Sequence, residues 1–172
     1  KEDSLRNLYM TLKGNTGKKP KVWLDAHSDE LGFIVQAIKP NGTMTFLPLG
    51  GWSPNNVPAS KVRVQNAEGD YLSGVVAAKP VHFMSQAEKS ASLNIENMVI
   101  DLGAVSAEDL KENFKIRMAA PVVPDVECTY DEKRDLFIGK AFDCRIGCAA
   151  VLESLNQLKE EKLDVDVVAT LS

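Results

Sequence analysis

The sequence predicts an α/β domain that is interrupted by an inserted all-β domain, and three observations support this fold class. Residues 21–26 form an apolar run that ends in a dense polar cluster, as expected of a buried strand. Near the other end of the chain, a helical pattern over residues 145–161 is followed by a strand-like run at 165–171. Between these pieces, many short strand candidates alternate with turn residues, which is typical of a small β-barrel or sandwich.

The two outer pieces, residues 1–30 and 137–172, carry the helix-and-strand pattern of a layered α/β domain. A short strand is expected at residues 8–12, before the turn residues that precede the first buried strand. The long helix is expected near residues 145–161 because apolar side chains recur there at helical spacing. These side chains are Ile146, Cys148, Val151, Leu152, Leu155 and Leu158.

The middle of the chain, residues 31–136, is expected to form the inserted β domain. Turn residues at 40–42 predict a hairpin between strands at 31–38 and 43–47. Two interruptions are predicted, a polar loop at 81–94 and a short helix that Ser106 caps and that ends near Glu112. Further strands are expected at 61–64, 71–76, 98–102, 122–124 and 136–138.

The composition is that of a globular protein, since 44% of the 172 residues are hydrophobic and 26% are charged. The formal net charge of −4 gives no electrostatic footprint for nucleic acid or for an anionic membrane surface. No apolar run approaches the length that spans a bilayer. The three cysteines lack the pattern of a secreted disulfide framework, which favours a cytoplasmic location.

A histidine and a carboxylate follow the first buried strand. Ligands of open α/β sheets bind at the carboxyl ends of the strands, which is where His27 lies. Residues i and i+2 of a strand point to the same side, so Asp29 is placed to accept the ring N–H of His27 and to fix its tautomer. This pair suits a metal ligand with its orienting partner. Taken alone the pattern is weak, because an ordinary strand-end histidine is more common.

Asp143 lies at the entry to the long helix, where an aspartate is commonly a helix cap. The insertion, however, would bring the two outer pieces together and with them His27 and Asp143. The two oxygens of a carboxylate can bridge two divalent cations, as in dinuclear hydrolytic sites. Cys144 and Cys148 are four residues apart and would share a helix face that could attract a metal, although small buried thiols on a packing face are more common.

Five short segments stand out along the chain: DAHSDELGF at 25–33, LGGW at 49–52, KPVH at 79–82, IDLGA at 100–104 and GKAFDCRIG at 139–147. They resemble, in the same order, segments of the cytosolic dinuclear-metal aminopeptidases. That family includes the glutamyl aminopeptidases and the tetrahedral, self-compartmentalising (TET) peptidases. The first segment resembles the family's metal-ligand segment and the last its bridging-aspartate motif. The resemblance extends over nearly the whole chain, from about Ser4 to Leu171.

The resemblance implies roles for individual residues. His27 is expected to be a terminal metal ligand, and Asp29 the residue of the catalytic site that orients it. Asp143 is expected to bridge two Zn²⁺ or Co²⁺ ions in the complete protein. His82 and Glu30 are weaker candidates for the site, and a solvated loop position is the more common situation for His82.

The chain also departs from the family pattern. Cys144 stands where the family usually has Asn or Asp, and Met118 where it more often has glycine. The family's general-base glutamate and its further metal ligands would follow Ser172, and the chain begins within polar sequence. The chain is therefore expected to be the N-terminal half of such an enzyme. Its outer pieces would be part of a zinc-peptidase-like catalytic domain, and 31–136 would be a barrel-like dimerisation domain.

By resemblance, the parent protein is a metal-dependent aminopeptidase that acts on peptides and forms homo-oligomers, from dimers up to dodecamers. The fragment is expected to be inactive alone and need not bind metal by itself. A different class of function is a structural dimerisation and assembly module without catalysis. Some family members are labelled cellulase or endoglucanase, so glycoside hydrolysis is a third possibility. It is less favoured because that reaction needs a pair of carboxylates that flank the sugar bond, and the sequence shows no persuasive pair.

Overall fold

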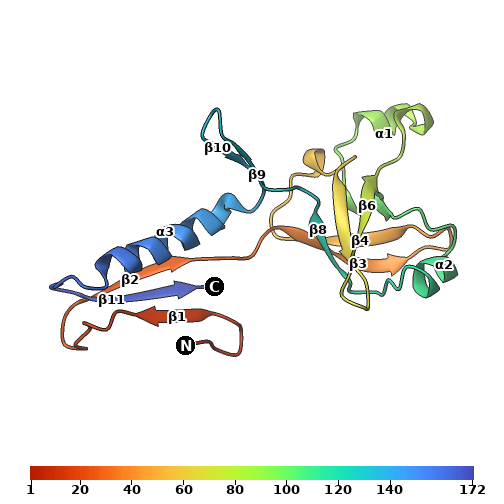
Figure 1. Cartoon of the computed structure of the whole chain (residues 1–172). Coiled ribbons are helices and arrows are strands. Elements are labelled where there is room, and N and C mark those ends of the chain that lie inside the picture. The colour runs from red at the N-terminus through yellow and green to blue at the C-terminus, as the bar shows by residue number, and fades with distance from the viewer. The chain divides into compact units, whose positions relative to one another are not determined.

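The computed structural model describes residues 1–172, which form two compact units. The first unit combines residues 1–30 with 139–172, and the second comprises residues 31–138. The chain thus leaves the first unit after Glu30, builds the second, and returns at Gly139 (Figure 1). No helix in the structure has the length and apolar character needed to cross a membrane.

The first unit is a three-stranded sheet with one long helix against it. The strand order is β1-β11-β2, in which β11 runs parallel to β2 and antiparallel to β1. The helix α3 packs against β2, and a small core of buried side chains lies between them (Figure 1). The elements are β1 (Leu8–Thr11), β2 (Lys21–Ala26), α3 (Phe142–Leu158) and β11 (Asp166–Leu171).

Apolar residues explain this layering. Ala26 of β2 and Ala169 of β11 are buried, and they meet Cys148 and Val151 from one face of α3. Small side chains on the sheet let the helix lie close, and each buried apolar group adds to stability in proportion to the area removed from water. The packing places the first turn of α3 at the end of β2, where the polar cluster begins.

The second unit is a closed six-stranded barrel, which confirms the predicted all-β barrel-like domain. The strands follow the order β3-β4-β7-β6-β5-β8, and each neighbouring pair is antiparallel. Closure leaves no sheet edge free for pairing with other chains. The strands are β3 (Gly32–Ile38), β4 (Met44–Leu49), β5 (Lys61–Gln65), β6 (Tyr71–Ala77), β7 (Val99–Asp101) and β8 (Pro121–Pro124).

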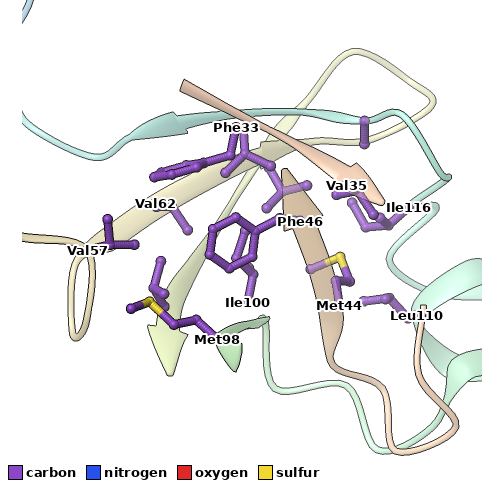
Figure 2. Packing of buried hydrophobic residues seen from close by; sticks show 14 of the residues in the cluster. Phe33, Val35, Met44, Phe46, Val57, Val62, Met98, Ile100, Leu110 and Ile116 are labelled. Carbon is purple, nitrogen blue, oxygen red and sulfur yellow. The ribbon is translucent and has the colours of Figure 1, made fainter. Parts of the chain in front are cut away.

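Alternating side chains fill the barrel. In β5, Val62 and Val64 are fully buried while their neighbours face outward, as the period of two requires. The rings of Phe33 and Phe46 meet edge to face with centroids 4.9 Å apart, a geometry that aromatic pairs favour. Figure 2 shows these side chains converging with Met44 and others on one interior. The barrel therefore has a packed core of its own.

Two parts of the barrel unit differ from the sequence predictions. The region 81–94, predicted as a loop, contains the 3-10 turn η2 (Val81–Phe83) and the helix α1 (Gln86–Ser90). Ser85 starts α1 with a capping box, in which the Ser85 hydroxyl accepts from the N–H of Glu88 and the Glu88 carboxylate accepts from the N–H of Ser85.

The second difference is a separate hairpin, in which β9 (Thr129–Asp131), which was not predicted, pairs with β10 (Leu136–Ile138). The predicted short helix is present as α2 (Ala107–Glu112), and two further 3-10 turns are η1 (Pro54–Asn56) and η3 (Ile95–Asn97).

Candidate metal centre

His27 lies directly beyond the carboxyl end of β2, in a short segment that is held in place on both sides. On the sheet side, the backbone N–H of Ser28 donates to the carbonyl of Ser172 at 2.5 Å, and the N–H of Ser172 donates to that of Ala26 at 3.0 Å. These two bonds continue the parallel β2–β11 pairing past the last strand residues. The backbone around His27 is therefore fixed at the carboxyl edge of the sheet, where ligands of α/β domains bind.

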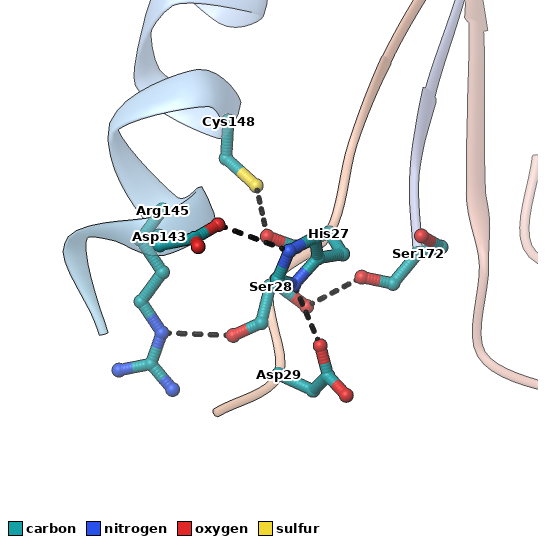
Figure 3. Close-up of polar contacts among 7 residues, drawn as sticks. All are labelled: His27, Ser28, Asp29, Asp143, Arg145, Cys148 and Ser172. Atoms are coloured by element: carbon teal, nitrogen blue, oxygen red, sulfur yellow. Dashed lines mark hydrogen bonds and ion pairs between the residues drawn. The ribbon is translucent and has the colours of Figure 1, made fainter. Parts of the chain in front are cut away.

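On the helix side, two residues of α3 form hydrogen bonds to the backbone of this segment. The side chain of Arg145 donates from Nε to the carbonyl of Ser28 at 2.8 Å, and the thiol of Cys148 donates to the carbonyl of His27 at 3.2 Å. Figure 3 shows both contacts reaching from the first turns of α3. Because each contact is to a backbone carbonyl, the imidazole of His27 itself stays available.

The two ring nitrogens of His27 face different carboxylates (Figure 3). Nδ1 is 2.8 Å from Oδ1 of Asp29, a hydrogen-bond distance. An ionised carboxylate only accepts, so Nδ1 donates in this contact, and in the neutral ring this tautomer leaves the lone pair of Nε2 for a metal ion. Nε2 lies 3.4 Å from Oδ1 of Asp143. Although the i, i+2 argument assumed a strand, both His27 and Asp29 lie in the irregular segment after β2.

Asp143 is not the helix cap, which was the alternative that the sequence left open. The N-cap position of α3 is Ala141, whose backbone is left-handed and whose side chain makes no capping bond. Asp143 and Cys144 have non-helical backbone angles inside the first turn, and the peptide bond between them is cis. The side chain of Asp143 is 96% exposed and projects from this irregular turn toward His27.

The donor atoms suit a divalent metal of the zinc type. Imidazole nitrogen, carboxylate oxygen and thiolate sulfur are the common ligands of Zn²⁺. Two such ligands on one tetrahedral ion, with bonds of about 2.0–2.2 Å, stand about 3.3–3.5 Å apart. The 3.4 Å between Nε2 of His27 and Oδ1 of Asp143 falls in this range. The sulfur of Cys144 completes a group whose ligand atoms all lie within 4.8 Å of one another.

The two weaker candidates lie outside this group of ligand atoms. The carboxylate of Glu30 pairs with Lys140 at 2.9 Å, and both side chains are mostly buried. Glu30 is thus engaged in an ion pair close to the point where the chain leaves and re-enters the unit. His82 belongs to the barrel unit, where it is exposed on η2. Cys144 has no predicted ligand role of its own, although its position four residues before Cys148 draws attention to both thiols.

Comparisons with known proteins identify the family of the chain. The sequence profile of the M42 glutamyl aminopeptidase family matches residues 6–172. A lysyl aminopeptidase of Pyrococcus furiosus is 30% identical over 173 residues, which cover 99% of this chain and 48% of that protein. A glutamyl aminopeptidase of Lactococcus lactis is 28% identical over 96% of this chain and 47% of its own length. The chain therefore spans about half the length of the curated relatives it matches.

The solved structures that resemble this chain also include aminopeptidases. A TET aminopeptidase from a marine sediment archaeon of the Thaumarchaeota superposes with a TM-score of 0.90 at 29% identity, covering 100% of this chain and 47% of its own. A structure described as a dodecamer of PhTET1 gives 0.80 at 25% identity, over 100% and 49%. One from Thermotoga maritima that is named an endoglucanase gives 0.73 at 28% identity, over 100% and 48%. With a profile match over nearly its whole length, the chain belongs to the M42 glutamyl aminopeptidase family.

Proposed function

We propose that the complete protein removes amino acids from the N-termini of peptides at a site that holds two divalent cations, Zn²⁺ or Co²⁺. The observation that carries this proposal is the placement of His27 and Asp143, whose Nε2 and Oδ1 stand 3.4 Å apart at the carboxyl edge of a parallel strand pair. Family membership supports a metallopeptidase reaction, and the donor set supports a zinc-type metal.

Each residue has a defined task in this proposal. Nε2 of His27 would bind one metal ion, while Asp29 accepts a hydrogen bond from Nδ1–H and so fixes the tautomer and increases the basicity of the ring. Asp143 has two carboxylate oxygens on an exposed side chain, and it would hold the second metal ion together with the first. Arg145 and Cys148 keep the backbone of His27 in place. When bound, the metal ions would acidify water at the site and polarise the peptide carbonyl, which gives a nucleophile at neutral pH.

The remaining parts of the site belong to the rest of the protein in this proposal. A closed first coordination shell needs four or more ligands for each ion, and His27 and Asp143 supply only part of it. The half-length match to the relatives supports the placement of the other ligands and of the general base outside the chain. We therefore expect the chain alone to be inactive toward peptides.

We also propose a cytoplasmic location for the protein, which the three free cysteines support.

The proposal is tested in the complete protein with Asp143→Ala. We expect peptide hydrolysis to be abolished and the bound metal content to fall, measured with amino-acid anilides and by elemental analysis. Glu68→Ala, an exposed carboxylate in the β5–β6 turn, is the matched control and should retain both. Normal anilide turnover by Asp143→Ala would overturn the assignment. A β-glucan, offered to the complete protein as a separate substrate, tests the glycosidase alternative, and we expect no hydrolysis of it.

A second function, assembly of the oligomer, is favoured by the β9–β10 hairpin. Its strands pair only with each other, and isolated two-stranded hairpins are marginal in water. Leu136, Phe137 and Ile138 are nonetheless 48%, 59% and 56% exposed, and Phe137 packs on Tyr130 with ring centroids 4.6 Å apart. Exposed apolar surface of this kind marks interaction sites. We propose a second copy of the chain as its partner, in keeping with the dodecameric relative.

Sedimentation velocity of the chain and of Phe137→Asp tests the assembly proposal. A charge at this position would have to be buried without a partner in the interface, so the variant should shift toward monomer. Val105→Asp changes another exposed apolar residue outside the hairpin, 83% exposed, and should leave the oligomeric state unchanged. A monomeric wild-type chain would refute assembly through this half of the protein.

A further inference from the structure

We propose that Cys144 supplies a thiolate ligand to the metal site, so that this chain by itself holds one thiophilic divalent cation through His27, Asp143 and Cys144. The inference concerns the same centre as the proposed function, but it does not depend on peptide hydrolysis. Its basis is that imidazole, carboxylate and thiol donors of these three residues all lie within 4.8 Å of one another. Three protein ligands and one water complete a tetrahedral zinc-type site.

The position of Cys144 in the first turn of α3 makes this placement possible. On a regular helix, neighbouring residues such as Asp143 and Cys144 would point about 100° apart around the axis. Both residues have non-helical backbone angles here, with φ −88° and ψ 107° for Asp143 and φ −116° and ψ 31° for Cys144. The irregular turn therefore allows two consecutive side chains to share one site with His27.

A glycine one turn along the helix makes room for the sulfur. A Cβ atom built at Gly147 would stand 2.4 Å from Sγ of Cys144 and 3.2 Å from Cβ of Ala26. The first distance is far below van der Waals contact, so any larger residue at this position would displace the thiol. Cys144 is thus held half-buried between Gly147 and the sheet, with its sulfur close to the exposed imidazole and carboxylate.

Only a small movement is needed to close the site around an ion. A tetrahedral Zn²⁺ ion with a bond of about 2.3 Å to sulfur and about 2.0–2.1 Å to nitrogen holds these atoms about 3.6 Å apart. The ligand atoms lie within 4.8 Å of one another, so torsion changes of the Cys144 or His27 side chain need to bring sulfur and nitrogen closer by at most about 1.2 Å. Rotation of the exposed Asp143 side chain then adjusts its oxygen positions without disturbing the core. On binding, the thiol proton passes to solvent as the sulfur–metal bond forms.

A thiolate ligand changes which metals the site prefers. Soft sulfur donors select thiophilic ions, whereas carboxylates alone suit harder ones. We therefore expect Zn²⁺, Cd²⁺ and Co²⁺ to bind this chain, and Mg²⁺ and Mn²⁺ to compete poorly. The other two thiols serve as internal comparisons, because Cys128 is exposed in the barrel unit and Cys148 is engaged with the carbonyl of His27.

The test is a Co²⁺ titration of the chain, followed by absorption spectroscopy. We expect one equivalent to bind, with the d–d bands of a tetrahedral site and a sulfur-to-cobalt charge-transfer band in the near ultraviolet. Cys144→Ser should lose the charge-transfer band and bind at least about tenfold more weakly, the lower end of the range seen when even an outer partner of a metal ligand is removed. Cys128→Ser should keep both.

Circular dichroism checks that Cys144→Ser is folded, and Cys144→Asn provides a second variant that also lacks sulfur. Absence of Co²⁺ binding by the wild-type chain, or binding without a charge-transfer band, would overturn the inference. So would persistence of the band in both Cys144 variants or its loss in Cys128→Ser. The proposed peptidase activity would survive each of these results, because it is measured separately on the complete protein with Asp143→Ala.

Discussion

His27 and Asp143 face each other across 3.4 Å between Nε2 and Oδ1, although one follows the strand β2 and the other belongs to the first turn of α3. Both side chains are well exposed, at 48% and 96%. An exposed pair of this kind contributes only about 0–1 kcal/mol to stability, because water screens the charges. Folding stability therefore gives little reason for the arrangement, whereas the shared metal ion that we propose would account for both the distance and the exposure.

Removal of the Asp29 carboxylate should weaken metal binding while the fold persists. The side chain of Asp29 is 83% exposed and accepts the 2.8 Å hydrogen bond from Nδ1 of His27. In Asp29→Ala the ring loses its orienting partner, for which we expect an affinity loss of about 10–100-fold. Competition with a chromophoric chelator in the complete protein measures it. Asp29→Asn, which can still accept the ring proton, should be intermediate.

Asp70→Ala is the matched control for this experiment, since Asp70 is an exposed carboxylate in the β5–β6 turn of the barrel unit. Its metal affinity should equal that of the wild type. An Asp29→Ala protein with unchanged affinity would show that His27 does not need this partner.

Gly147→Ala should destabilise the first unit and disturb the thiol of Cys144. The added methyl group would meet Sγ at 2.4 Å and the side chain of Ala26 at 3.2 Å. Overpacking of this kind typically costs about 1–3 kcal/mol. Urea unfolding gives the free energy of unfolding. Gly14→Ala adds the same methyl group in a turn with no atom within 4 Å, and its cost should be much smaller; equal effects of the two substitutions would contradict the packing argument.

Glu30→Gln should lower stability because it breaks an ion pair that is mostly shielded from water. The side chains of Glu30 and Lys140 are only 16% and 19% exposed and their charged atoms are 2.9 Å apart. We expect a loss of about 2 kcal/mol, between the values for exposed and for fully buried pairs. Glu88→Gln removes the charge of the exposed pair with Lys79, at 2.7 Å, and should have a smaller effect in the same urea experiment. A larger loss of stability in Glu88→Gln than in Glu30→Gln would contradict the importance of burial.

Asp166 should make stability depend on pH in the acid range. This residue begins β11, is 1% exposed, and accepts a hydrogen bond from the backbone N–H of Thr16 at 2.7 Å. That bond holds the pKa of the carboxyl below its ordinary value of 3.8. The folded state then binds fewer protons than the unfolded state in this range. The stabilisation is therefore present above pH 3.8 and is lost as the pH falls through the lower, folded-state pKa.

Comparison of the wild-type chain with Asp166→Asn measures this contribution. The wild type should be more stable at neutral pH, and the difference should shrink as the pH falls below 3.8. Asp164→Asn, two residues earlier and exposed, should follow the wild type at every pH. A difference that is constant with pH would assign the effect to packing instead of charge.

Elements with a clear apolar pattern were predictable from the sequence, whereas β9 and α1, which lack one, were not. The strand β11 is a run that is buried along most of its length, and the helix α3 buries Cys148 and Val151 on one face, so both patterns show in the residues. The strand β9 consists of exposed and half-exposed residues, which leave no alternation to read. The helix α1 buries no residue, and its signal was the capping box of Ser85 and Glu88.

The site was only partly predictable for a related reason. The contact between His27 and Asp29 was predicted from their i, i+2 spacing, although the strand that this argument assumed ends at Ala26. The approach of Asp143 depends on how β2 and α3 pack, which the predicted insertion suggested and local spacing does not contain. The helix pattern began at Arg145, whereas α3 starts at Phe142 with an irregular turn. That irregular turn brings Cys144 to the site. The regular helix that the apolar pattern predicts does not place Cys144 there.

The central claim is that His27 and Asp143 bind the same metal ion, and a double-mutant cycle on Zn²⁺ affinity in the complete protein tests it most directly. The variants are His27→Ala, Asp143→Ala and the double substitution. Ligands of one ion act together, so the double variant should lose little more affinity than the weaker-binding single variant. Losses that add independently would show that the two residues do not share an ion, and would contradict the account.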